Sequence, residues 1–197
     1  TLSVHTWLIN NSDTAPSLRI IMGNDMSADA VSYAIEYTKA EDTPTYYWLP
    51  FLSSPNEQGC VLTASSEYSG SYQMEYAFNG LTNNYWACAI SDSQRWVQVQ
   101  MPYALRNIAV KLTSPQGGAV TTANVPASGA FQGSNDGSSW AALGSYSGRS
   151  TAAGSVTTHS LNNSTGYKYL RISITSPGAS SGVWTGFGDI RIEGEVA

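Results

Sequence analysis

Charged side chains are scarce in this sequence. Lys, Arg, Asp and Glu together make up 12% of its 197 residues, about half the share found in an average globular protein. The formal net charge is −5, and Lys and Arg form no cluster anywhere along the chain. Binding to a nucleic-acid backbone or to an anionic membrane surface requires clustered positive charge. The sequence therefore argues against nucleic acid as a partner and against membrane binding.

Cysteine is also rare, because Cys60 and Cys88 are the only two. Two are too few for a disulfide-stapled scaffold, and both one bridge and two buried free thiols remain open. No apolar run reaches 18 residues, so we expect no membrane-spanning helix. No signal peptide is visible at Thr1, and a start without Met favours a mature product or a fragment.

The residues that catalysis requires are few as well. The histidines are His5 and His159, and a histidine-based triad would need one of them. Gly178-Ala-Ser180-Ser-Gly182 formally matches a nucleophile elbow, but Pro177 and the neighbouring Ser and Gly predict a loop where that motif needs a strand and a helix. No spacing pairs the acidic residues as glycosidase carboxylates; these are Glu67, Glu75, Asp92, Asp136 and Asp189. We therefore expect no enzymatic activity.

Apolar residues alternate with polar ones along much of the chain, which is typical of antiparallel strands with one buried face. The turn Asn135-Asp136-Gly137 predicts a hairpin between residues 130–133 and 140–143, because these residue types tolerate positive φ. The fold class is therefore all-β. We expect these alternating side chains to be buried: Val97, Val99, Met101, Ile108, Val110, Leu112, Leu170, Ile172, Ile174, Ile190 and Ile192.

Residues 1–55 form a separate part in this interpretation. Short strands are predicted at residues 2–10, 18–22, 31–37 and 46–49, with a helical turn at 26–34 as the alternative to part of the third. We expect a small β-rich N-terminal domain or an extra layer, with its boundary at Ser53-Ser54-Pro55-Asn56. The second domain then spans residues 56–197.

Five sequence pieces stand in a fixed order within the second domain. They are Glu75-Tyr-Ala-Phe-Asn79-Gly80, Trp86, Arg95-Trp96-Val97-Gln98-Val99-Gln100-Met101, Gly133-Ser-Asn135-Asp136-Gly137-Ser-Ser-Trp140, and the pair Tyr169–Ile174 and Asp189–Ile192. In this order and spacing the chain resembles the discoidin family, which includes the C-type domains of coagulation factors and the family 32 carbohydrate-binding modules. The resemblance implies an eight-stranded antiparallel β-sandwich, like galactose-binding domains, that binds a ligand through loops at one end without catalysis. We assign Trp86, Trp96 and Trp140 to its core.

The resemblance also implies a structural Ca²⁺ in the turn before Trp86. Oxygen ligands suit this hard cation, and the family pattern maps them onto Phe78, Asn79, Asn84 and Asp189. Asn79 replaces a charged Asp and Asn84 replaces a hydroxyl, so affinity should be lower than in the family pattern. A tight turn held by asparagine side chains alone is the alternative.

Sugar binding needs flat aromatic rings and polar groups on exposed loops. We expect the binding surface on residues 68–73, 114–128, 145–155 and 178–186, since long loops on a rigid sandwich usually carry function. Trp184 is the candidate stacking platform. The other candidates are Tyr68, Tyr72, Arg149 and His159, while packing inside the domain is the alternative for each.

Two contexts fit a non-catalytic domain that binds carbohydrate. One is the receptor-binding head of a phage tail fibre, which would recognise a cell-surface glycan and form a homotrimer. The other is an accessory module of a secreted bacterial glycoside hydrolase or adhesin, and a protein-binding adhesion domain also stays open. Each places the protein outside a cell or on a virion surface.

Overall fold

The computed structural model describes residues 44–197 except 82, 117–119, 151 and 177–182, together with the short strands at 19–21 and 34–36. The chain divides into two compact units, Thr1–Thr43 and Pro44–Ala197. In the first, β1 (Arg19–Ile21) pairs antiparallel with β2 (Ala34–Glu36), inside two of the predicted strands. The strand predicted at residues 2–10 and most of the alternative helical turn lie outside the described residues.

The second unit starts earlier than the sequence predicts. Strand β3 (Tyr46–Trp48) pairs antiparallel with β13 (Asp189–Val196), with Trp48 opposite Glu193 and Tyr46 opposite Glu195. Residues before the expected boundary at 53–56 therefore belong to the sandwich. The reason is a long-range pairing with the last strand, which no local pattern reveals.

The described part of this unit contains two short 3-10 turns and otherwise strands and loops. Its remaining elements are β4 (Asn56–Glu57), β5 (Cys60–Ala64), η1 (Met74–Ala77), β6 (Trp86–Cys88), β7 (Trp96–Thr113), η2 (Thr122–Asn124), β8 (Ser128–Ser134), β9 (Ala141–Tyr146), β10 (Val156–Ser160), β11 (Tyr167–Ser176) and β12 (Thr185–Phe187). The strands at the predicted alternating segments and at the predicted hairpin are present, whereas β6 and β12 are buried at every residue and do not alternate. Strands β6 and β12 form a separate two-stranded sheet, and nine strands join into a larger one. Among the described residues, no helix has the length and apolarity needed to cross a bilayer.

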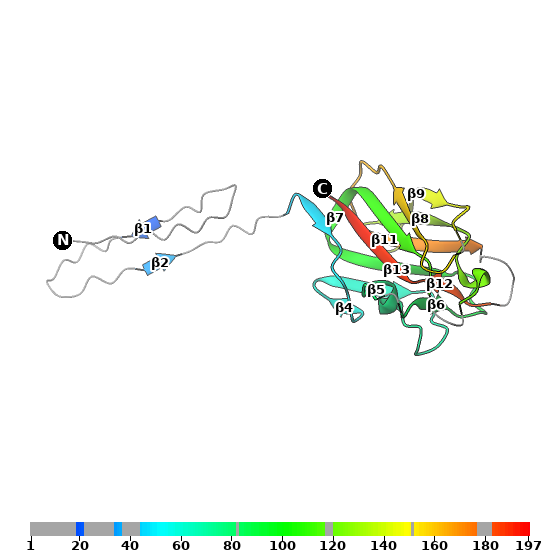
Figure 1. Cartoon of the computed structure of the whole chain (residues 1–197). Helices are drawn as coiled ribbons and strands as arrows, with labels where there is room; N and C mark the ends of the chain where they lie inside the picture. The colour runs from blue at the N-terminus through cyan, green and yellow to red at the C-terminus, as the bar shows by residue number, and fades with distance from the viewer. Residues whose placement is uncertain are drawn as a thin grey trace. The chain divides into compact units, whose positions relative to one another are not determined.

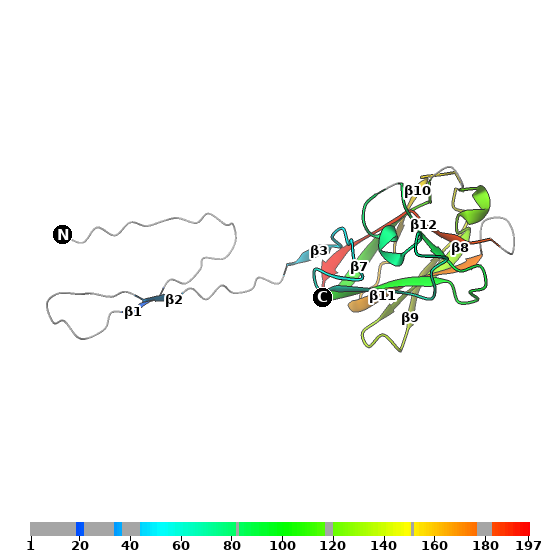
Figure 2. The same cartoon turned by 90° about the horizontal axis from the view of Figure 1, so that it is seen from below.

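The long strand β7 holds the two layers of the sandwich together. Its first part, residues 96–100, pairs with β5 and β11, whereas residues 105–113 pair with β13 and residues 109–113 also pair with β10. Figures 1 and 2 show green β7 running beside red β13, which ends at the C-terminus. One strand thus belongs to both layers, and the apolar side chains of both meet in a single core.

The core contains the side chains that the alternation places there. All eleven apolar residues of the predicted alternating strands are buried, and so is Trp86. Cys60 and Cys88 are free buried thiols. The assignment of Trp96 and Trp140 to the core is wrong: both are half-buried, and they flank Arg171 with ring centroids 4.2 and 3.9 Å from its Cζ atom. Trp96 points away from the core because it precedes the inward-facing Val97 in the alternation.

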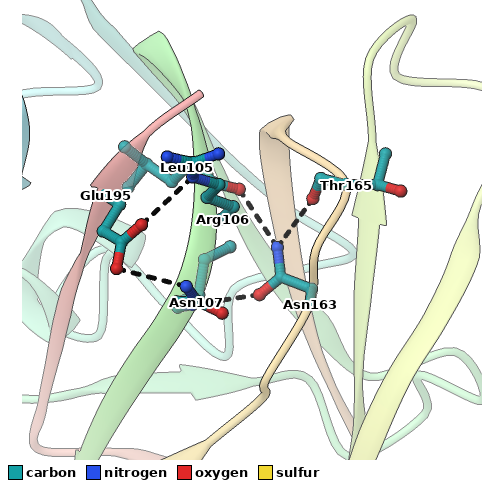
Figure 3. A network of polar contacts seen from close by, with 7 residues as sticks. Leu105, Arg106, Asn107, Asn163, Thr165 and Glu195 are labelled. Carbon is teal, nitrogen blue, oxygen red and sulfur yellow. Dashed lines mark hydrogen bonds and ion pairs between the residues drawn. The ribbon is translucent and has the colours of Figure 1, made fainter.

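A buried asparagine stabilises the irregular part of β7. Asn163 accepts a hydrogen bond from the amide of Ile108 at 2.9 Å through Oδ1, and its Nδ2 donates to the carbonyls of Leu105 and Thr165 at 3.1 and 2.8 Å. Figure 3 shows this network next to the contact of Arg106 with Glu195. The pairing of β7 with β13 shifts register here, so Asn163 satisfies backbone groups that the sheet leaves unpaired.

The strand register brings several loops to one end of the sandwich. Ala64 at the end of β5 lies opposite Val97, and Trp96 lies opposite Ser173 near the end of β11. Thr113 at the end of β7 lies opposite both Val156 and Asp189, where β10 and β13 begin. Ala127 donates to the carbonyl of Ser176 at 3.0 Å, and Arg149 donates to the carbonyls of both Leu112 and Pro126, so the two ends of β7 lie at the same end of the sandwich. The described residues of the connections 65–73, 89–95, 114–127 and 147–155 share this end, which we call the loop end. It lies away from the C-terminus, with η2 beside it (Figures 1 and 2).

Candidate functional site

Four aromatic rings lie together at the loop end, and we call them the aromatic cluster: Tyr68, Tyr72, Tyr85 and Trp184. Trp184 stacks on Tyr85 with ring centroids 5.1 Å apart and an interplanar angle of 17°. Tyr72 and Tyr68 lie 5.7 and 6.4 Å from Trp184, tilted by 30° and 33°. Three residues predicted from the sequence as ligand contacts are thus neighbours in space.

The four rings of the cluster differ in exposure, from the buried Tyr85 to the exposed Tyr68. Tyr85 is 7% exposed and Tyr68 is 42% exposed, while Tyr72 and Trp184 are half-buried. Burial, together with a hydrogen bond to Tyr72, raises the pKa of Tyr85 far above its usual value. Its phenol is therefore neutral at any physiological pH.

Main-chain hydrogen bonds hold the segments that carry these rings. The amide of Tyr68 donates to the carbonyl of Ala87 at 2.8 Å, and the amide of Ala87 donates to the carbonyl of Tyr72 at 3.4 Å. The loop after β5 is thereby attached to β6. Trp184 directly precedes β12, which pairs with β6, so the four rings belong to one connected piece of backbone.

Tyr85 is a member of the cluster that the sequence prediction missed. It directly precedes the core residue Trp86 in the sequence, and it was not among the candidate ligand contacts. The pairing of β6 with β12, with Trp86 opposite Phe187, brings Tyr85 close to Trp184. This proximity depends on residues about a hundred positions apart, so only the folded structure could reveal it.

Arg149 and His159 lie outside the cluster. Arg149 is 6% exposed, so the prediction that it contacts a ligand directly conflicts with its burial. His159 is half-buried on β10, with its ring 5.2 Å from Phe131 and 5.9 Å from Tyr146. Burial and the nearby Arg149 lower the pKa of His159, which keeps the imidazole neutral at pH 7.

An aspartate fixes the second loop at this end. The hydroxyls of Ser65 and Ser66 donate to one carboxylate oxygen of Asp92, and the amides of Gln94 and Arg95 donate to the other at 2.7 and 3.2 Å. Burial alone would raise the pKa of Asp92, but these hydrogen bonds outweigh it and hold the pKa below its usual value. The ionised carboxylate thus ties residues 89–95 to the loop that carries Tyr68.

We expect the Asp92→Asn variant to be less stable than the parent at neutral pH. A depressed folded-state pKa contributes stability above the unfolded-state pKa, about 3.9, and that contribution is lost as pH falls through the lower folded value. The difference in unfolding free energy between parent and variant should therefore be largest above about pH 5 and shrink in acid. Urea titrations at several pH values measure it, and a difference independent of pH would contradict this role.

One of the predicted calcium ligands has the property that a cation site requires. Asn84 Oδ1 is buried and has no hydrogen-bond partner among the described residues. Asn84 lies two residues before Trp86, and Asp189 lies two residues after Phe187, the residue that pairs with Trp86. The pairing of β6 with β12 stops at Trp86 and Phe187, and Asp189 pairs with Thr113 of β7.

The other predicted ligands are already engaged. Arg191 donates to both carboxylate oxygens of Asp189 at 2.6 and 2.8 Å, and Asn79 Oδ1 accepts the amide of Leu81 at 3.0 Å. The carbonyl of Phe78 accepts the amide of Leu52 at 3.1 Å. No group of three or more His, Cys, Asp or Glu that could hold a metal occurs within the described part of the chain. The donors therefore fit a cation only in part.

A hollow lies at the opposite end of the sandwich from the aromatic cluster. Its volume is about 300 Å³, and its lining is mostly polar: Ala142, Leu143, Leu161, Asn162, Asn163, Ser164, Thr165 and Tyr167. Tyr167 is the one aromatic side chain in that lining. This hollow therefore offers a ligand far less ring surface than the aromatic cluster does.

The architecture is that of an antiparallel β-sandwich with an aromatic cluster on the loops at one end. A family model of the F5/8 type C domain matches residues 61–188, which is more than half of the chain. The chain belongs to the F5/8 type C domain family, and the resemblance to discoidin domains is confirmed. No curated protein matches the sequence.

Solved structures with this fold include carbohydrate-binding modules. One is a family 32 module of Clostridium perfringens in complex with GalNAc-β-1,3-galactose, with a TM-score of 0.57, 15% identity, and coverage of 71% of this chain and 99% of that one. Another module from the same organism, in complex with galactose, has a TM-score of 0.56, 15% identity and coverage of 75% and 98%. A chitosan-binding module of a Paenibacillus chitosanase/glucanase has a TM-score of 0.51, 20% identity and coverage of 67% and 92%.

Proposed function

We propose that this chain binds a glycan, without catalysis, through the aromatic cluster at its loop end. The observation that carries the proposal is the half-buried Trp184, placed among Tyr68, Tyr72 and Tyr85. Similar structures that bind galactose, GalNAc-β-1,3-galactose and chitosan support the ligand class.

The physical chemistry of the cluster suits a sugar ring. Rigid aromatic side chains provide a large contact area at a low cost in conformational entropy, and their flat faces can pack against the C–H groups of a pyranose. The exposed Tyr68 can offer its phenol hydroxyl to hydroxyl groups of the ligand, as tyrosine combines an apolar body with a polar tip.

The comparisons favour the accessory module over the tail-fibre head. The chitosan-binding module comes from a chitosanase/glucanase, and another similar structure is a module from a family 31 glycoside hydrolase. We therefore propose an accessory binding module that acts outside a cell. Recognition of a host glycan by a virion, and the homotrimer that it suggests, stay predictions without support from the comparisons.

A glycan array followed by calorimetric titration tests the proposed function. We expect a hit among galactose-containing glycans or chitosan oligosaccharides, with an affinity in the weak range typical of a shallow site. A monomer that binds one glycan class supports the accessory module, and a trimer that does so favours the fibre. Binding to one protein without any glycan hit would replace the proposal with adhesion.

Calcium binding at the turn before Trp86 stays a prediction. We expect excess Ca²⁺ to raise the melting temperature of chelator-treated protein by mass action. Arg191 already neutralises Asp189, so the rise should need Ca²⁺ of about 10⁻⁴ M or more. Asn84→Ala should abolish the rise. Equal melting temperatures in excess chelator and in excess Ca²⁺ would remove the metal and leave the fold assignment untouched.

A further inference from the structure

The main chain of Trp184 is held by a buried side chain from a different loop. Asn124, in η2, donates through Nδ2 to the carbonyl of Trp184 at 3.0 Å, and its own carbonyl accepts the hydroxyl of Thr185 at 3.1 Å. Asn124 is 4% exposed. Asn124 is therefore hydrogen-bonded to Trp184 through its side chain and to Thr185 through its main chain, and these two residues set the position of the Trp184 ring.

Asn124 is itself fixed within its loop. Its Oδ1 accepts both the amide and the hydroxyl of Thr121, at 2.8 and 2.9 Å. All of its side-chain hydrogen-bonding groups except one amide hydrogen are thus assigned to named partners. A side chain bonded in this way has one rotamer available, and it transmits the position of its loop to Trp184.

A buried cation fixes the other end of that loop. Arg149 donates to the carbonyl of Pro126, near the end of the 114–127 loop, at 3.3 Å, and to the carbonyl of Leu112, shortly before the loop begins, at 3.2 Å. It also donates to Thr157 Oγ1 at 3.0 Å and to Ser114 Oγ at 3.4 Å. Neither of the ion pairs found among the described residues involves Arg149.

Arg149 is therefore a cation buried mainly against main-chain carbonyls and hydroxyls. Burying a charge without an opposite charge is costly, and its Cζ atom lies 5.6 Å from the ring centroid of Phe187 and 5.9 Å from that of Tyr146. The arginine fork lets one side chain reach both ends of the 114–127 loop at once. The buried Arg149 side chain therefore holds Pro126 next to Leu112, which fixes the end of the loop.

We propose that Asn124 and Arg149 are positioning residues of the aromatic cluster. Arg149 fixes the loop through Pro126, and Asn124 passes this position to Trp184. The proposal rests on the proposed function for its effect on affinity, but the effect on the Trp184 ring can be measured without any ligand.

The test uses the full chain and the signals of its six tryptophan indole groups in nitrogen-labelled protein. The variant Trp184→Phe identifies the Trp184 signal. In Asn124→Ala we expect that signal to shift or broaden while the other five hold their positions. We also expect affinity for the best glycan from the array to fall about tenfold, since a site loses affinity when its supporting residues are removed.

A matched control separates positioning from general stability. Asn163 is also a buried asparagine whose side chain makes three hydrogen bonds, but it contacts Leu105, Ile108 and Thr165 at the end of the sandwich opposite the loop end. Asn163→Ala should lower stability without moving the Trp184 signal or the affinity. If both asparagine variants move the Trp184 signal equally, or if neither does, Asn124 has no positioning role.

Milder variants keep the proposal testable if Asn124→Ala fails to fold. Thr185→Val removes only the hydroxyl that bonds to Asn124, and Arg149→Lys keeps the charge but loses the fork. Both should shift the Trp184 signal in the direction that Asn124→Ala does, by a smaller amount; an unchanged signal in both would overturn the proposal. A parent chain that binds no glycan would end the proposed function, while these signals would still decide whether the network positions Trp184.

Discussion

Replacing Trp184 with alanine should weaken glycan binding at least tenfold, about 1.4 kcal/mol, without unfolding the domain. Trp184 contacts all three other rings of the aromatic cluster, so its removal takes away the centre of the surface rather than its edge. Its half-buried state means that the core loses little. Calorimetric titration with the best glycan from the array measures the loss in affinity, and a thermal melt checks the fold.

Trp140→Ala is the matched control for this experiment. Trp140 is half-buried like Trp184, but its ring lies against Arg171 on the outer face of the sheet. Its replacement should leave the affinity unchanged. If Trp184→Ala binds as well as the parent, the aromatic cluster is not the site, and the polar hollow beside Tyr167 becomes the first alternative.

Replacing Asn163 with alanine should lower the free energy of unfolding by about 2–4 kcal/mol, because it leaves a buried amide and two carbonyls without their partner. The amide of Ile108 is the most costly of these, since Ile108 is buried in the core. Urea titration should show a lower midpoint with an unchanged slope. The affinity for the glycan should stay that of the parent.

Asn135→Ala provides the comparison for this loss. The Asn135 side chain likewise bonds to the main chain, with two hydrogen bonds (to the carbonyl of Gly166 and from the amide of Lys168) where Asn163 has three, but Asn135 is exposed. Water can replace its hydrogen bonds, so we expect a cost below about 1 kcal/mol. Equal costs for the two asparagines would show that Asn163 does not support the register shift of β7.

The sequence by itself determined the strands and the class of fold. The alternation of Val97, Val99 and Met101 with Gln98 and Gln100 is a local property, because successive side chains of a strand point to opposite faces. The hairpin at Asn135-Asp136-Gly137 is local as well: Gly137 has a φ of 73°, and Asp136 accepts the amides of Ser138 and Ser139. Such signals need no knowledge of distant parts of the chain.

Only the tertiary structure decided which aromatic residues meet. Tyr68, Tyr72 and Trp184 were recognisable as loop aromatics, but their contact, and the inclusion of Tyr85, depend on the pairing of β6 with β12. The same limit explains the burial of Arg149 and the half-buried position of Trp140, whereas the outward direction of Trp96 follows from the local alternation with Val97. A side chain's burial depends on what the rest of the chain places above it, and that is settled by contacts between segments that are distant in the sequence.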